Sequence, residues 1–107
     1  MEISQYQIIL VNLDPTLGSE IKKTRPCIVI SPNEMNLFLN TVVIAPMTTS
    51  SKNYPTRIEV KHDNKIGWIV LDQIRTIDKQ RIIKDLGRLT KSEINEIKSV
   101  LKETYID

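Results

Sequence analysis

The apolar residues of this chain fall into short runs that turn residues separate, and only the last segment has a helical period. The longest runs cover residues 8–11, 27–30, 42–47 and 68–71. Runs of four to six apolar residues bounded by Pro, Gly, Asn or Asp are typical of buried β-strands. They are far below the roughly 20 residues that a membrane-spanning helix needs, so we expect no membrane segment.

We expect strands over residues 7–13, 26–31, 41–45, 56–61, 67–72 and 82–86. Pro46 is expected to close the third of these, and Pro32-Asn33-Glu34 to end the second. Residues 16–23 and 48–55 are predicted loops, and Asp63-Asn64-Lys65 a hairpin turn. Residues 74–81 fit either a short extension or a turn.

The last segment predicts a helix of roughly four turns. Thr90 and Glu93 have the spacing of a capping box, in which a hydroxyl and a carboxylate satisfy the first free amides of a helix. One apolar stripe follows, formed by Ile94, Ile97, Leu101 and Tyr105. We predict a mostly β fold, a small β-barrel or curved antiparallel sheet with a C-terminal helix, in one domain over residues 1–107.

Composition excludes only a few classes of function. The 107 residues include 15 Lys and Arg against 13 Asp and Glu, a net charge of +2, which is too small to diagnose nucleic-acid binding. The N-terminus has neither the basic start nor the apolar segment of a signal peptide. Cys27 is the single cysteine, so no intramolecular disulfide and no cysteine zinc cage can form. We expect a cytoplasmic protein with Cys27 as an inert buried thiol.

The residue inventory also excludes several chemistries. His62 is the single histidine and sits beside the predicted hairpin turn, where an exposed turn residue is the better interpretation than a catalytic base. No phosphate-binding glycine loop, zinc-protease motif or metal-spaced carboxylate set is present. The polar residues that remain are concentrated in two loops, 18–25 and 47–53.

Three segments, read together, resemble the MazF/PemK family of toxin endoribonucleases. They are residues 11–20 (VNLDPTLGSE) with 24–32 (TRPCIVISP), residues 43–50 (VIAPMTTS) with Tyr54-Pro55 downstream, and residues 70–78 (VLDQIRTID). The order Asp-Pro, Gly-Ser-Glu, Arg-Pro in the first segment is the specific part. With the spacing between them, the segments cover nearly the whole chain.

The resemblance implies an SH3-like, CcdB/PemK-like barrel with a C-terminal helix, a homodimer, and cleavage of single-stranded RNA at short sequences with no metal and no cofactor. It also implies a cognate MazE/PemI-like antitoxin that neutralises the toxin. By the same resemblance Arg25 and Thr48 take the catalytic positions. The RNA-binding positions fall on Ser19, Glu20, Thr49, Ser50 and Gln73.

The implied chemistry suits these residue types. When the RNA 2′-OH attacks the adjacent phosphate, negative charge builds on the non-bridging oxygens. A guanidinium can donate two hydrogen bonds to those oxygens, and a hydroxyl can donate a third. The products would be a 2′,3′-cyclic phosphate or 3′-phosphate and a free 5′-OH. Arginine has a pKa above about 12 and is a poor general base, so charge stabilisation is its better-supported role.

Each residue also has a structural interpretation. Arg25 could be an ion-pair residue at a strand start, and Thr48 a turn hydroxyl that bonds to its own backbone. We expect Trp68 to pack in the core rather than to stack on a base. Two other function classes stay open: a gyrase poison of the CcdB type, whose C-terminal Trp-Gly-Ile is absent here, and a non-catalytic RNA-binding barrel, which usually displays more exposed aromatic residues.

Overall fold

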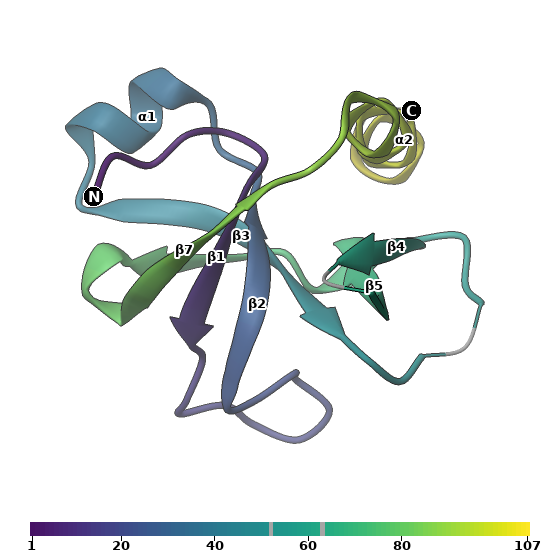
Figure 1. Cartoon of the computed structure of the whole chain (residues 1–107), viewed down its shortest axis with the longest axis horizontal. Coiled ribbons are helices and arrows are strands. Elements are labelled where there is room, and N and C mark those ends of the chain that lie inside the picture. The colour runs from purple at the N-terminus through teal and green to yellow at the C-terminus, as the bar shows by residue number, and fades with distance from the viewer. Residues whose placement is uncertain (52, 63) are drawn as a thin grey trace.

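The computed structural model describes residues 1–51, 53–62 and 64–107. These residues form one antiparallel sheet with helical segments around it (Figure 1). The strands are β1 (Gln7–Asn12), β2 (Thr24–Val29), β3 (Thr41–Thr48), β4 (Arg57–His62), β5 (Lys65–Val70), β6 (Arg75–Asp78) and β7 (Ile82–Arg88). The helices are α1 (Asn33–Phe38) and α2 (Lys91–Leu101), with the short 3-10 turns η1 (Leu71–Gln73) and η2 (Lys79–Arg81) and the π-helical turn η3 (Lys102–Ile106).

The strand order is β4-β5-β3-β2-β1-β7, and β6 pairs with the first half of β3. Every pair in the described part is antiparallel, and the sheet does not close into a barrel. The predicted mostly β fold with a C-terminal helix is therefore confirmed, and of its two forms the curved open sheet is the one observed.

Strand β3 organises the sheet because it changes partners along its length. Its middle pairs with β2, with Cys27 opposite Pro46, and its end pairs with β5, with Thr48 opposite Trp68. The prediction that Pro46 ends this strand is wrong. Pro46 lies where β3 leaves β2 for β5, so the missing amide hydrogen interrupts no continuous ladder.

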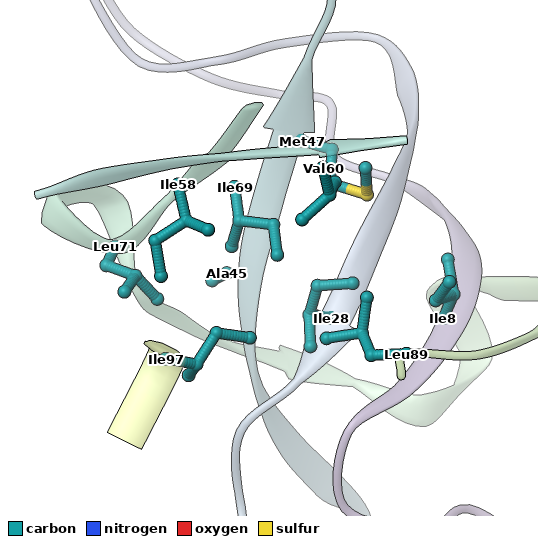
Figure 2. Packing of buried hydrophobic residues seen from close by; sticks show 10 residues of the cluster. All are labelled: Ile8, Ile28, Ala45, Met47, Ile58, Val60, Ile69, Leu71, Leu89 and Ile97. Carbon is teal, nitrogen blue, oxygen red and sulfur yellow. The ribbon is translucent and has the colours of Figure 1, made fainter. Parts of the chain in front are cut away.

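Two apolar clusters pack on opposite faces of β1 and β2, because neighbouring residues of a strand point to opposite sides. Figure 2 shows the first cluster, in which Ile97 of α2 packs with residues of β1 to β5, with Leu71 of η1 and with Leu89, which follows β7. The strand residues are Ile8, Ile28, Ala45, Met47, Ile58, Val60 and Ile69. The second is formed by Ile3, Ile9, Val11, Leu13, Cys27, Val29, Val42, Ile44 and Ile77. Burial of both faces explains why the sequence of β1 is a continuous apolar run.

The C-terminal helix begins as predicted. The Thr90 hydroxyl accepts a hydrogen bond from the Glu93 amide, and the Glu93 carboxylate accepts one from the Thr90 amide. Ile97 is fully buried, while Ile94 and Leu101 are half-buried against the first cluster. Tyr105 differs from the predicted stripe, because its ring is exposed and its hydroxyl donates a hydrogen bond to the Leu71 carbonyl.

The helix α1 is absent from the sequence-based expectation. Its only buried residue is polar: Asn36 donates a hydrogen bond to the Ser31 carbonyl and accepts one from the Ser31 hydroxyl. A six-residue helix with a buried amide has no apolar period to detect.

The expected strands at 7–13, 26–31, 56–61, 67–72 and 82–86 correspond to β1, β2, β4, β5 and β7, with shifts of up to two residues at each end. Residues 74–81 form both an extension, β6, and a turn, η2. The hairpin between β4 and β5 pairs His62 with Lys65, and Asn64 has a φ of 62°. Asp63 and the His62 side chain lie outside the described residues.

Candidate functional site

A pocket of about 240 Å³ opens where β3 leaves β2 for β5. Figure 1 shows β2 and β3 spreading apart at this point. The pocket is lined by Arg25 and Pro26 of β2, Met47 and Thr48 of β3, Thr49, Lys65, Ile66 and Gly67 of β5, and Leu86 of β7. Two predicted catalytic residues from segments 23 positions apart therefore share one pocket.

Arg25 is held at the pocket edge by the loop that precedes β2. It is half-buried, and its Nε donates a hydrogen bond to the Lys22 carbonyl at 3.2 Å. The Nη atoms of Arg25 make no hydrogen bond within the described residues. The paired N–H groups that could bind a phosphate therefore stay available.

Thr48 lies at the last position of β3, and its hydroxyl bonds to the backbone of Ser50. The hydroxyl donates to the Ser50 carbonyl at 3.2 Å and accepts from the Ser50 amide at 3.3 Å. The turn role that the sequence allowed for Thr48 is thus present. Both bonds are long and the residue is half-exposed, so they hold the hydroxyl weakly.

The other predicted RNA-binding residues divide into two groups. Thr49 lines the pocket with Arg25 and Thr48, but Ser19, Glu20, Ser50 and Gln73 are not among its lining residues. Glu20 accepts a hydrogen bond from the Leu17 amide, and Gln73 bonds to the backbone of the loop that contains Ser19. The structure therefore brings together three of the seven predicted site residues.

Lys65 is a pocket residue that the sequence-based analysis missed. Arg25 and Lys65 are the only charged side chains among the described residues that line the pocket, and both are cationic. Lys65 was part of a predicted turn, and only the pairing of β5 with β3 and β4 carries it to the pocket. A pocket whose described lining residues include two cations and no carboxylate favours an anionic ligand.

Gly67 lines the pocket at a position where a side chain would be crowded. A Cβ at this position would lie 3.2 Å from Met47 Cε and 3.7 Å from the Thr48 carbonyl oxygen. The glycine therefore permits the close approach of β5 to the end of β3.

The sequence predicts that both Cys27 and Trp68 are buried, and the structure confirms this for Cys27 alone. Cys27 is fully buried as predicted, and this burial raises the pKa of its thiol to about 12, although the charge of Arg75 acts in the opposite direction. The prediction that Trp68 packs in the core is wrong. Trp68 is half-buried and belongs to neither cluster, whereas Ile69, the next residue of β5, is fully buried in the first cluster. Neighbouring residues of a strand point to opposite faces of the sheet.

In the described part of the chain, no three His, Cys, Asp or Glu side chains gather as metal ligands would. Among the same residues, no helix has both the length and the apolar character needed to cross a bilayer.

Known structures share this fold. The fold matches that of MazF from Deinococcus radiodurans with a TM-score of 0.85 at 22% identity, covering 96% of each chain. It also matches a mycobacterial endoribonuclease solved in complex with its cognate antitoxin, with a TM-score of 0.80 at 22% identity, over 94% of this chain and 92% of that one.

The sequence itself carries the relationship further. The chain belongs to the family of PemK-like, MazF-like toxins of type II toxin-antitoxin systems, whose family profile matches residues 4–105. It is 31% identical over 105 residues to the endoribonuclease MazF of Staphylococcus epidermidis, covering 92% of this chain and 88% of that protein. The family resemblance predicted from the three sequence segments is confirmed.

Proposed function

We propose that this protein is a toxin endoribonuclease that cuts single-stranded RNA without a metal or cofactor, using the pocket between β2 and β3. The observation that carries the proposal is that Arg25 and Thr48 line one pocket together with Lys65. Support comes from the family match and from the activity in the name of the staphylococcal relative.

In the proposed reaction the RNA supplies its own nucleophile. The 2′-oxygen bonds to the adjacent phosphorus as it loses its proton, and the bond from phosphorus to the 5′-oxygen breaks as that oxygen gains a proton. The Nη groups of Arg25 donate to the non-bridging oxygens, where charge builds, and the Thr48 hydroxyl adds a third donor. A 2′,3′-cyclic phosphate and a 5′-OH result, and water can open the cyclic phosphate to a 3′-phosphate.

Lys65 and Thr49 are assigned to binding. Lys65 is exposed and lines the same pocket, so its ammonium can pair with a phosphate beside the one that reacts. Thr49 follows Thr48 directly and is also exposed, which suits a hydrogen bond to a nearby base or sugar. We assign Arg25 to charge stabilisation rather than proton transfer, because a guanidinium does not lose its proton near neutral pH.

The proposal extends to partners and compartment. The mycobacterial structure with a similar fold contains its cognate antitoxin, and we propose that a MazE/PemI-like antitoxin neutralises this chain, which acts as a homodimer. We further propose one toxin domain over residues 1–107, because the family profile spans 4–105 and α2 shares a cluster with the sheet. The unpaired, buried Cys27 fits a reducing cytoplasm.

The two rival classes receive less support. The family match favours the MazF/PemK toxins over a CcdB-type gyrase poison. A non-catalytic RNA-binding barrel would use aromatic side chains as stacking platforms, and no aromatic residue is among the described residues that line the pocket.

The test is cleavage of a labelled single-stranded RNA pool in the presence of a chelator, with the new 5′-OH ends sequenced. We expect wild-type protein to cut at a short recurrent sequence and Arg25→Ala to lose at least about a hundredfold in rate. Lys65→Ala should mainly raise KM and make the salt dependence less steep, since about one phosphate contact is lost. Arg88→Ala, an exposed arginine that does not line the pocket, serves as the matched control.

Intact RNA with the wild-type protein would refute the proposal, and binding without cleavage would indicate the RNA-binding class. Gyrase-dependent DNA breaks in the absence of RNA cleavage would indicate the gyrase poison instead. Equal cleavage by wild type and Arg25→Ala would refute the catalytic role of Arg25, but not the RNA-cleaving activity of the protein.

A further inference from the structure

The turn η1, between β5 and β6, receives hydrogen bonds from three other parts of the chain. Its first residue, Leu71, is fully buried. The Leu71 amide donates to the Thr56 carbonyl at 3.0 Å, and the Leu71 carbonyl accepts from the Tyr105 hydroxyl at 2.5 Å. The turn is therefore anchored in the core while its next two side chains, Asp72 and Gln73, reach in different directions.

Gln73 holds the loop that precedes β2. Its Oε1 accepts a hydrogen bond from the Ile21 amide at 2.8 Å, and its Nε2 donates to the Ser19 carbonyl at 3.4 Å. Ile21 is followed by Lys22, whose carbonyl accepts the hydrogen bond from Arg25 Nε at 3.2 Å. A short path of contacts thus leads from η1 to the Arg25 guanidinium.

Asp72 holds the loop that follows β3. Its two carboxylate oxygens accept bonds from Arg57 Nε and Nη2, both at 3.2 Å, and the Thr56 hydroxyl adds a third at 2.9 Å. The remaining nitrogen of the same guanidinium, Nη1, donates to the Ser51 hydroxyl at 3.0 Å, and the Tyr54 ring centroid lies 4.8 Å from Arg57 Cζ. A bidentate pair with this many further contacts fixes geometry better than an ordinary surface ion pair.

We infer that Gln73 and Asp72 are positioning residues for the RNA-cleaving pocket. Gln73 sets the orientation of Arg25 by way of residues 19–22. Asp72, by way of its contact with Arg57, sets the position of the loop that follows Thr48. The inference rests on the proposed function. It also gives Gln73 a different role from the base contact that the family resemblance implies, because both ends of its amide already bond to the protein backbone.

Limited proteolysis tests, without any assay of activity, whether Gln73 holds the loop that precedes β2. Lys22 and Lys23 are exposed and lie in the loop that Gln73 holds, so trypsin can report on loop opening. We expect Gln73→Met to raise the rate of the first cut after these lysines at least about fivefold. Tyr105→Phe is the matched control, since it removes a hydrogen bond to the same turn but none to either loop, and we expect no change.

Steady-state cleavage of RNA then separates positioning from contact. We expect Gln73→Met to lower kcat about tenfold and to change KM less than twofold, because the charge of Arg25 is kept but its orientation is not. Gln73→Glu keeps the acceptor for the Ile21 amide and should restore kcat to within about threefold of wild type. Asp72→Asn should lower kcat in the same way, because it weakens the bonds to Arg57.

The cut sequences decide between the two roles of Gln73. A positioning residue leaves the recurrent cut sequence unchanged in Gln73→Met, whereas a base-reading residue changes it, and a changed sequence would overturn the inference. Wild-type tryptic rates and wild-type kcat for Gln73→Met would also overturn it. Failure of wild-type protein to cut RNA would refute the proposed function instead, and the proteolysis experiment would still test whether Gln73 holds the loop that precedes β2.

Discussion

The substitution Thr48→Val separates the catalytic role of Thr48 from its role in a turn. Valine keeps the branched shape of threonine and replaces only the hydroxyl, which bonds to the Ser50 backbone at 3.2 and 3.3 Å, with a methyl group. A hydrogen bond of ordinary geometry contributes about 0.5–1.5 kcal/mol, and these are long and partly exposed. We therefore expect the free energy of unfolding to fall by about 1 kcal/mol.

A loss of that size cannot lower the cleavage rate through unfolding. A domain with roughly 5 kcal/mol of stability stays more than about 99% folded after losing 1 kcal/mol. If the hydroxyl donates to the phosphate, however, the single-turnover cleavage rate should fall about a hundredfold, as when one oxyanion donor is removed. The two roles thus predict rates that differ by about two orders of magnitude.

The assay is single-turnover cleavage of a labelled RNA, with urea unfolding measured on the same preparations. Thr48→Ser keeps the hydroxyl and should cut within a few-fold of the wild-type rate. If Thr48→Val cleaves within twofold of wild type while Arg25→Ala does not cleave, the hydroxyl has no catalytic role and Thr48 is only a turn residue.

Three further predictions concern side chains that do not line the pocket. At pH 8 a thiol with a pKa of about 12 is thiolate in about one molecule in ten thousand, against about one in four for an unfolded cysteine. Cys27 should therefore react with a thiol reagent at least about a thousandfold more slowly in the folded protein than in urea; comparable rates would contradict its burial. Ile97→Ala should lower the free energy of unfolding by about 2–4 kcal/mol in a urea titration, because the side chain is fully buried. Ile94→Ala, on the same helix but half-buried, should cost about 1 kcal/mol, and equal losses would argue against the packing of α2. Burial raises the pKa of Asp72, but the hydrogen bonds from Arg57 and neighbouring groups outweigh it, so the pKa is lowered overall. The contribution of Asp72 to the free energy of unfolding is therefore complete above about pH 4. It is lost as the pH falls through the lowered folded-state pKa. The difference in stability between wild type and Asp72→Asn should shrink on acidification, and a constant difference would contradict the assignment.

Local sequence signals predicted the regular elements where the physical cause is local. The helix α2 follows from the capping box at Thr90 and the apolar stripe through Ile97, both of which act within a few residues. The strands followed from apolar runs. The helix α1 was not predicted because its buried residue is an asparagine. The end of β3 was predicted too early, because a proline fits within β3 only where the strand changes its pairing partner.

The pocket was predictable only in part. Arg25 and Thr48 were identified by the family resemblance and do line one pocket, together with Thr49. Lys65 gave no signal, since a lysine beside a hairpin turn is usually a solvated residue. Gln73 was expected to face RNA, but its amide bonds to the backbone of a loop more than 50 residues earlier in the chain.

By itself the amino-acid sequence determined the strand-rich fold, the capped C-terminal helix and the family, because turn residues, apolar runs and capping patterns act over short distances. The tertiary structure alone decided that the sheet stays open, that β3 passes from β2 to β5, and that Lys65 joins Arg25 and Thr48. It alone showed that Asp72 and Gln73 hold the two neighbouring loops. Such contacts depend on how distant segments pack, and no local pattern records the partner that a side chain meets across the fold.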